Sequence, residues 1–114
     1  MEYILGTIKR FIIISLETAY KEALLFTKSH YENFPVVSLF LPKHLRKHVA
    51  VVYQFARQAD DIVDEGIESV ERRMKNLELY GIHLRNCLNG IYENDFWCAL
   101  HTTITEHNLT PKYF

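Results

Sequence analysis

The chain lacks the cysteines and the net charge that mark several classes of protein. Only two of its 114 residues are cysteines. Cys87 and Cys98 fit no metal-binding spacing and are too few for a disulfide framework, so we expect a reducing compartment. The formal net charge is −1, which gives no electrostatic argument for nucleic acid as a partner. No repeat, low-complexity segment or linker divides the sequence, which favours a single domain.

A long apolar run is also missing. The run Phe11–Leu16 follows two basic residues, as the start of a signal peptide would, but it reaches only to Glu17. A signal peptide needs roughly 7–15 apolar residues, and a helix that crosses a bilayer needs about 20. We therefore expect no signal peptide, no membrane span and a cytoplasmic protein.

What the sequence does contain is apolar residues at helical spacing, which predict an all-α chain. Ser69 and Asp95 are the predicted N-caps of the third and fourth helices. The apolar stripes of the second and third helices are expected to face the core; they comprise Leu45, Val49, Val52, Tyr53, Ala56 and Val63, then Met74, Leu77, Leu84 and Leu88. The four expected helices cover residues 15–30, 43–65, 70–88 and 96–107.

Two segments need separate interpretation. Val36–Leu41 is expected to be a packed loop, because no nearby segment could pair with it as a strand. Thr110 and Pro111 form an N-cap followed by the first position of a fifth helix, of which only three more residues are present. We interpret residues 1–114 as the N-terminal portion of a larger all-α domain.

The most informative segment is Arg57–Glu65, at the end of the second predicted helix. Asp60 and Asp64 are four residues apart, and so are Asp61 and Glu65, so each pair shares a helix face and repels. The helix dipole also opposes negative charge in a last turn. A helix built only for stability would carry lysines here, so we infer that the carboxylates hold a cation.

The donor atoms indicate which cation this is. The cluster offers only carboxylate oxygens, which suit Mg²⁺ or Mn²⁺, whereas zinc prefers nitrogen or sulfur. The spacing does not match a calcium loop. Mg²⁺ takes one or two protein carboxylates and completes its shell with water and phosphate oxygens, which indicates a Mg²⁺-bridged diphosphate with Arg57 as a phosphate partner. The alternative is a solvated acidic helix end.

Three strings of residues together resemble the squalene/phytoene synthase family of head-to-head prenyl transferases. The strings are His30–Pro42, Tyr53–Glu65 and, more loosely, Phe96–Pro111. The first, His-Tyr-Glu-Asn-Phe-Pro, is most similar to the bacterial hydroxysqualene synthase branch of hopanoid synthesis. The resemblance implies an all-α isoprenoid synthase fold, in which two aspartate-rich helices face each other across a cavity and hold Mg²⁺ against a substrate diphosphate.

The resemblance also implies residue roles. Asp60 and Asp64 match metal ligands, and with Arg57 and Tyr53 they form the implied catalytic set. The implied substrate is farnesyl or presqualene diphosphate, with squalene or hydroxysqualene as the product, whose apolar chain implies transient membrane contact. The positions that match substrate-binding residues are His30, Phe34, Tyr53, Arg57 and Asp61.

The family carries a second aspartate-rich motif in its C-terminal half, and this sequence has none after Asp95. We therefore expect the chain alone to be inactive and to expose apolar faces where further helices would pack. Two classes of function stay open. One is a Mg²⁺-dependent prenyl transferase of which this chain is the N-terminal part, and the other is a non-catalytic helical remnant or a partner-binding half of a split enzyme.

Several of these residues have a purely structural alternative. Arg57 can pair with Asp61 one turn later, and His30 can cap the end of the first helix. His44 and His48 share a helix face, but the lysines and the arginine around them argue against a metal there.

Overall fold

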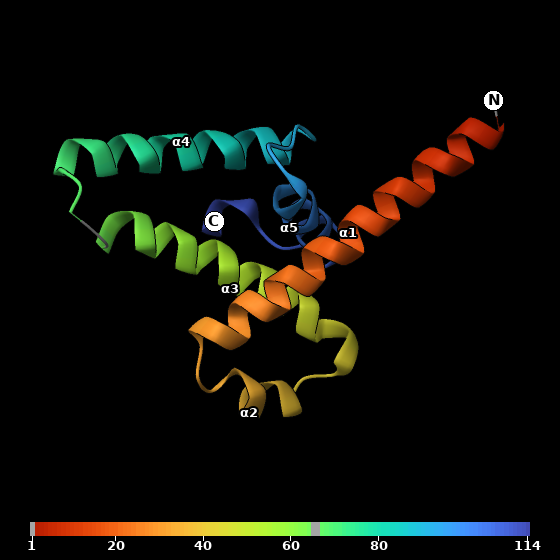
Figure 1. The fold of residues 1–114 in the computed structure, drawn as a ribbon, viewed down its shortest axis with the longest axis horizontal. Coiled ribbons are helices and arrows are strands. Elements are labelled where there is room, and N and C mark those ends of the chain that lie inside the picture. The colour runs from red at the N-terminus through yellow and green to blue at the C-terminus, as the bar shows by residue number, and fades with distance from the viewer. Residues whose placement is uncertain (1, 65–66) are drawn as a thin grey trace.

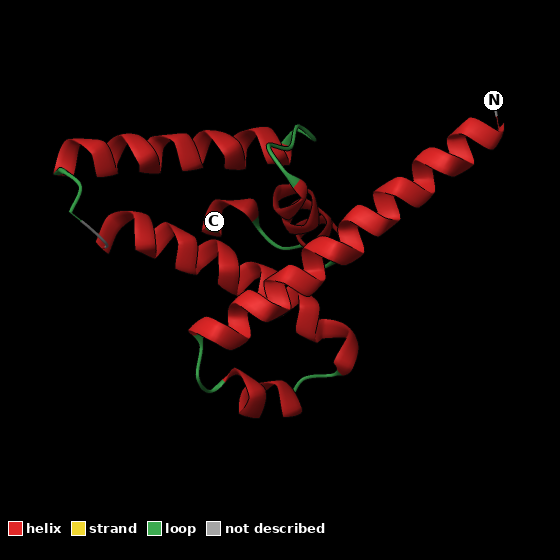
Figure 2. Ribbon diagram, viewed as in Figure 1, coloured by secondary structure: helices red, strands yellow, loops and turns green. Residues whose placement is uncertain are grey.

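All regular elements of the computed structural model, which describes residues 2–64 and 67–114, are helices (Figures 1 and 2). The predicted all-α class is therefore confirmed. The elements in chain order are α1 (Glu2–His30), α2 (Phe34–Leu39), α3 (Lys43–Asp64), α4 (Val70–Leu88), α5 (Asp95–Glu106) and the 3₁₀ turn η1 (Pro111–Tyr113).

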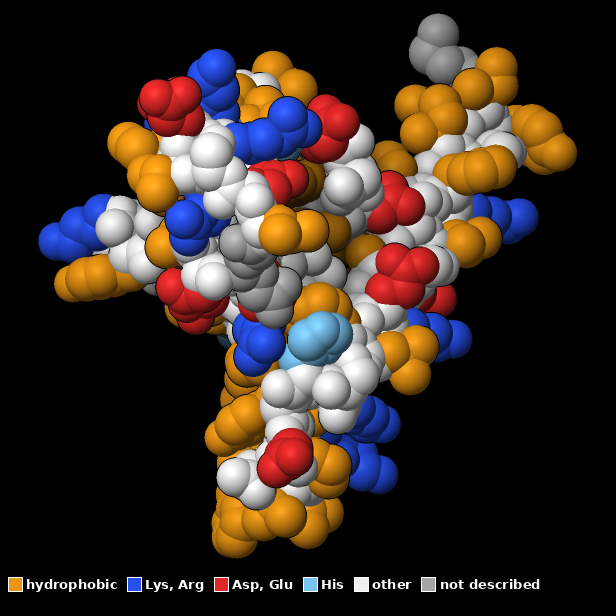
Figure 3. All heavy atoms as spheres, turned by 60° about the vertical axis from the view of Figure 1, so that its left-hand side comes forward, with side chains coloured by type: hydrophobic (Ala, Val, Ile, Leu, Met, Phe, Trp, Pro, Cys, Tyr) orange, Lys and Arg blue, Asp and Glu red, His pale blue; other side chains and the backbone are white. Residues whose placement is uncertain are grey.

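Helix α3 is the central element of the arrangement. The C-terminal half of α1 crosses it, α5 packs against both, and α4 returns along α3 (Figure 1). The N-terminal half of α1 projects from this body, and hydrophobic side chains cover it (Figure 3). Every residue from Glu2 to Ile14 is exposed. No helix in the described ranges combines the length and the apolar character needed to cross a membrane.

A chain of buried hydrogen bonds connects the three central helices. The Tyr20 hydroxyl of α1 donates to the Ala99 carbonyl oxygen at 3.1 Å and lies 2.8 Å from the Thr103 hydroxyl of α5. Thr103 in turn lies 2.8 Å from Nδ1 of His48 on α3. Because a carbonyl only accepts, the Tyr20 proton is committed to Ala99, so Thr103 donates to Tyr20 and accepts from His48 Nδ1–H.

Small residues allow these helices to approach closely. Ala23 of α1, Ala50 of α3 and Ala99 of α5 are all 0% exposed, and the Thr27 hydroxyl of α1 donates to the Ala50 carbonyl oxygen at 3.2 Å. Larger apolar side chains fill the remaining space; the buried ones include Val51, Cys87, Trp97, Leu100 and Ile104.

The predicted helix ends are confirmed in part. Ser69 is the N-cap of α4 and accepts a hydrogen bond from the Arg72 amide, but α5 is capped by Asn94, one residue before the predicted Asp95. The prediction of a loop at Val36–Leu41 was wrong. Residues 34–39 form α2, with Pro35 in its first turn, where a proline needs no amide hydrogen.

The first helix also begins earlier than predicted, at Glu2 instead of residue 15. Its N-terminal half contains no proline, and a helix extends readily from a packed end once it is nucleated. The N-terminal half of α1 is therefore helical because the helix propagates from its packed end, and not because its side chains are buried.

Half of the predicted core stripes face outward. Val49 and Val63 of α3 are 39% and 47% exposed, and Met74 and Leu77 of α4 are 61% and 41% exposed. The part of α3 that is buried instead is His48, Ala50 and Val51. The predicted exposure of apolar faces is thus observed. Only Leu84 and Leu88 of the α4 stripe pack against the core.

We expect Thr103→Val to lower the free energy of unfolding by about 1–3 kcal/mol, because it leaves Nδ1–H of buried His48 without its acceptor and removes the Thr103 donor from the Tyr20 oxygen. Thr102→Val is the matched control, since among the described residues the Thr102 hydroxyl bonds only to the Cys98 carbonyl of its own helix; it should cost less than about 0.5 kcal/mol. Urea unfolding measures both. Equal costs would contradict a stabilising role for the buried hydrogen-bond chain.

Candidate functional site

The candidate site is built on one face of α3. Tyr53, Arg57, Asp60 and Asp64 follow one another at helical spacing, so their side chains lie in a row along the helix. Asp60 and Asp64 are both exposed, and within the described residues neither carboxylate takes part in an ion pair. Their oxygens are therefore available to a ligand from solution. Glu65, the fourth acidic residue of the motif, lies outside the described residues.

Arg57 is held in this row by its neighbour one turn later. Its Nε donates to Oδ1 of Asp61 at 3.0 Å, so the pairing considered for these two residues is present. The Asp61 charge raises the pKa of Arg57 above its ordinary value, and the hydrogen bonds that Arg57 donates to Asp61 and to Tyr53 add to the shift. The site thus offers a permanent positive charge beside two free carboxylates.

Asp61 itself faces a different side of α3. It lines a polar hollow of about 700 Å³ together with Gln54, Gln58, Tyr80 and His83. Asp60 and Asp64 are not part of that lining. Asp61 is therefore placed to orient Arg57, while the two exposed carboxylates are left for a cation.

An apolar groove of about 510 Å³ opens at the other end of the row. Tyr53 belongs to both the groove and the row of polar residues, so it marks the boundary between them. Five lining residues belong to α3, and all of them except His48 were predicted to face the core. The other three come from α5 and the segment after it. The full lining is Leu45, His48, Val49, Val52, Tyr53, Thr103, His107 and Leu109.

The groove shows what sequence reasoning missed. Thr103, His107 and Leu109 lie about fifty residues from α3 in the chain, and no local pattern reveals that they meet it. The apolar stripe on α3 was the only feature of the sequence that pointed to the groove. Its periodicity predicts a core-facing surface, whereas in the structure the stripe lines an open groove.

His30 and Phe34 are connected to Tyr53 through aromatic contacts. The Tyr31 ring lies 5.5 Å from that of Tyr53 and 6.5 Å from that of Phe34. His30 is exposed, stacks on Phe26 at 4.0 Å and bonds through Nδ1 to the Phe26 carbonyl oxygen at 2.8 Å. This is the helix-capping role considered for His30. Phe34 is 2% exposed and packs in the core.

Comparisons with known proteins agree with one another. The family model described as "Squalene/phytoene synthase" matches residues 27–114. A hydroxysqualene synthase from Zymomonas mobilis is 36% identical over 101 residues, which covers 84% of this chain and 33% of that protein. A bifunctional lycopene cyclase/phytoene synthase from Sporisorium reilianum is 34% identical over 61 residues, or 54% of this chain and 8% of that protein.

A solved structure is also similar. The crystal structure of squalene synthase HpnC from Alicyclobacillus acidocaldarius matches with a TM-score of 0.77 and 39% identity, over 87% of this chain and 36% of that chain. The chain therefore spans about a third of the length of the hydroxysqualene synthase and of the squalene synthase that it matches.

The row of carboxylates should weaken the helix that carries it. We expect Asp60→Asn and Asp64→Asn each to raise the free energy of unfolding in EDTA, by a few tenths of a kcal/mol, because each removes a negative charge from the negative end of α3. Asp95→Asn, in the first turn of α5, should lower it, since negative charge is favourable there. Urea unfolding of the three variants measures these changes. Destabilisation by all three changes would contradict this interpretation.

Proposed function

We propose, from the premise that the chain belongs to the squalene/phytoene synthase family, that it carries the first metal and diphosphate half-site of a head-to-head prenyl transferase. The substrate is farnesyl or presqualene diphosphate, and the product is squalene or hydroxysqualene. The observation that carries the proposal is the row on α3, in which two free carboxylates and a charged arginine lead directly to an apolar groove.

The donor set fits Mg²⁺, with Mn²⁺ as an alternative. Asp60 and Asp64 are one turn apart, about 6 Å along the helix, and present only hard oxygen donors to solvent. Mg²⁺ typically binds one or two carboxylates and takes its remaining ligands from water and phosphate. Bound there, Mg²⁺ would neutralise negative charge on the departing diphosphate.

The chain's own residues supply binding and exclusion of water. Arg57 keeps its charge and can exchange Asp61 for a phosphate oxygen, to which a guanidinium binds in a fork. Tyr53 lies at the start of the apolar groove, where the prenyl chain would continue away from the diphosphate. The groove walls remove water from the carbocation that forms when the diphosphate leaves. Phe34 positions Tyr53 through the Tyr31 ring, and His30 does so through the Phe26 ring, whose centroid lies 6.5 Å from that of Tyr53.

We further propose that residues 1–114 are the N-terminal portion of one synthase domain, whose C-terminal part brings the second set of carboxylates. Two observations support this: the chain spans about a third of the relatives it matches, and large apolar side chains on α1, α2, α3 and α4 are exposed. Val63, Met74 and Leu77 line a shared hollow between α3 and α4. A cytoplasmic protein with peripheral membrane contact is consistent with so apolar a product.

Binding of farnesyl thiodiphosphate, an unreactive substrate analogue, tests the half-site. We expect calorimetry to show binding that requires Mg²⁺ and weakens by about tenfold or more in the double variant Asp60→Asn with Asp64→Asn, since both carboxylates hold the bridging ion. The matched control is Glu71→Gln with Glu78→Gln, which removes the same two charges from exposed positions of α4. Affinity that is unchanged by EDTA, or lost equally in both variants, would refute the half-site.

The proposed domain completion has its own test. The C-terminal two-thirds of the Alicyclobacillus squalene synthase, produced as a separate polypeptide, should associate with this chain without Mg²⁺. Met74→Gln with Leu77→Gln should weaken that association about tenfold or more, because it removes apolar contact area. Lys75→Gln with Glu78→Gln, beside them on α4, should not. If sedimentation detects no complex, the chain is a remnant and not part of such a domain.

A further inference from the structure

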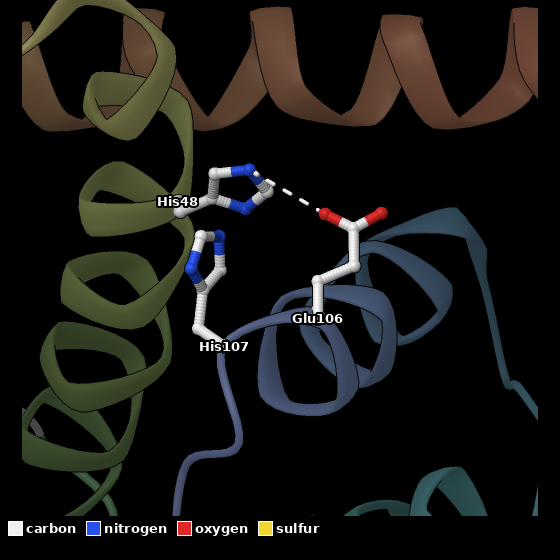
Figure 4. A group of neighbouring side chains, drawn as sticks. All are labelled: His48, Glu106 and His107. Atoms are coloured by element: carbon white, nitrogen blue, oxygen red, sulfur yellow. Dashed lines mark ion pairs between the residues drawn. The ribbon is translucent and has the colours of Figure 1, made fainter.

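A second group of ligand-type side chains lies at the opposite end of α3 from the acidic row. His48 comes from the second turn of α3, and Glu106 and His107 come from the end of α5 (Figure 4). Nε2 of His48 is 3.8 Å from Oε2 of Glu106, and the centroids of the His48 and His107 rings are 4.4 Å apart. One ligand atom from each residue lies within 4.8 Å of the other two. We propose that these three side chains form a Zn²⁺ site.

The buried hydrogen-bond chain sets the ligand atom of His48. The Tyr20 hydroxyl donates its hydrogen bond to the Ala99 carbonyl oxygen, so Thr103 donates to Tyr20 and accepts from Nδ1–H of His48. The lone pair is then on Nε2, the nitrogen that faces Glu106 in Figure 4. Histidines that bind metals in proteins commonly make the same arrangement: the ring nitrogen that does not bind the metal donates a hydrogen bond to a fixed acceptor, which orients the ring.

The cluster also contains the negative charge that a bound cation needs. Glu106 and the negative end of the α5 dipole supply compensating negative charge for a bound cation.

The three side chains differ in how freely they can move. His48 is 8% exposed and fixed by Thr103, whereas Glu106 and His107 are exposed. Zinc–nitrogen and zinc–oxygen bonds of about 2.0–2.2 Å require the ligand atoms to draw closer than they are. The two exposed side chains can make that adjustment around the fixed His48, which leaves a fourth position for water.

The donor chemistry separates this site from the acidic row. Two imidazole nitrogens and one carboxylate oxygen are a zinc set, while Mg²⁺ prefers oxygen alone. His48 and Asp60 are twelve residues apart on α3, about 18 Å along the helix. The histidine pair also differs from the pair considered in the sequence, because the second ligand is His107 of α5 and not His44. Bound Zn²⁺ would join the start of α3 to the end of α5.

Titration with Zn²⁺, and with Co²⁺ as a visible probe, tests the proposal on the intact chain. We expect one Zn²⁺ per chain and a melting temperature that rises by several degrees at saturation, because the metal binds only the folded state. His107→Ala and Glu106→Gln should each weaken binding about tenfold or more. Both positions are exposed, so the melting temperature without metal should stay close to that of the unchanged chain.

Two control variants make the result specific. His44→Ala removes an exposed histidine one turn before His48, and Asp60→Asn with Asp64→Asn removes the acidic row; both should bind Zn²⁺ as the unchanged chain does. Zinc binding that survives His107→Ala would overturn the site. So would binding that is lost in either control, or no binding at all. His48 and His107 also line the apolar groove proposed for the prenyl chain. Binding of inorganic pyrophosphate with Mg²⁺ depends instead on Arg57, Asp60 and Asp64, so these zinc results do not bear on it.

Discussion

The hydrogen-bond chain from Tyr20 through Thr103 to His48 fixes α3 between α1 and α5, and the remaining structure depends on it. Close contacts between alanines hold the helices together but allow them to rotate and slide, whereas three directional bonds in a buried setting do not. With α3 fixed, Val51 points into the core, the polar row from Tyr53 to Asp64 points to solvent, and Nε2 of His48 points toward Glu106. One buried network thus orients both candidate metal sites.

The acidic end of α3 shows a conflict between stability and function. Two exposed carboxylates one turn apart repel each other and the helix dipole, and no described residue forms an ion pair with them. Arg57 pairs with Asp61 instead, and Arg73 of α4 donates to the Val63 carbonyl oxygen. Natural sequences commonly break local rules at functional sites. In the function we propose, a bound divalent cation and a diphosphate would remove this conflict, which would account for carboxylates that face outward and lead to an apolar groove.

Local patterns predicted local features well. The spacing of apolar residues predicted the helices, Ser69 the start of α4 and the acidic motif the exposed row. Two kinds of feature were beyond such patterns. A stripe such as Val49 and Met74 is apolar whether it faces the core, a groove or a helix supplied by another segment, so its periodicity cannot say which. Long-range meetings such as that of His48 with His107 depend on how α5 packs, and no spacing within one helix encodes them.

The most direct test of the account is where a divalent cation binds when diphosphate is present. Mn²⁺ added with inorganic pyrophosphate broadens the backbone amide signals of nearby residues in an NMR spectrum, and Mn²⁺ favours the same oxygen donors as Mg²⁺. The account predicts that broadening at low Mn²⁺ is strongest for residues 57–64 of α3 and requires pyrophosphate. Broadening centred on the polar hollow beside Asp61, or spread evenly over the acidic side chains of the surface, would contradict it.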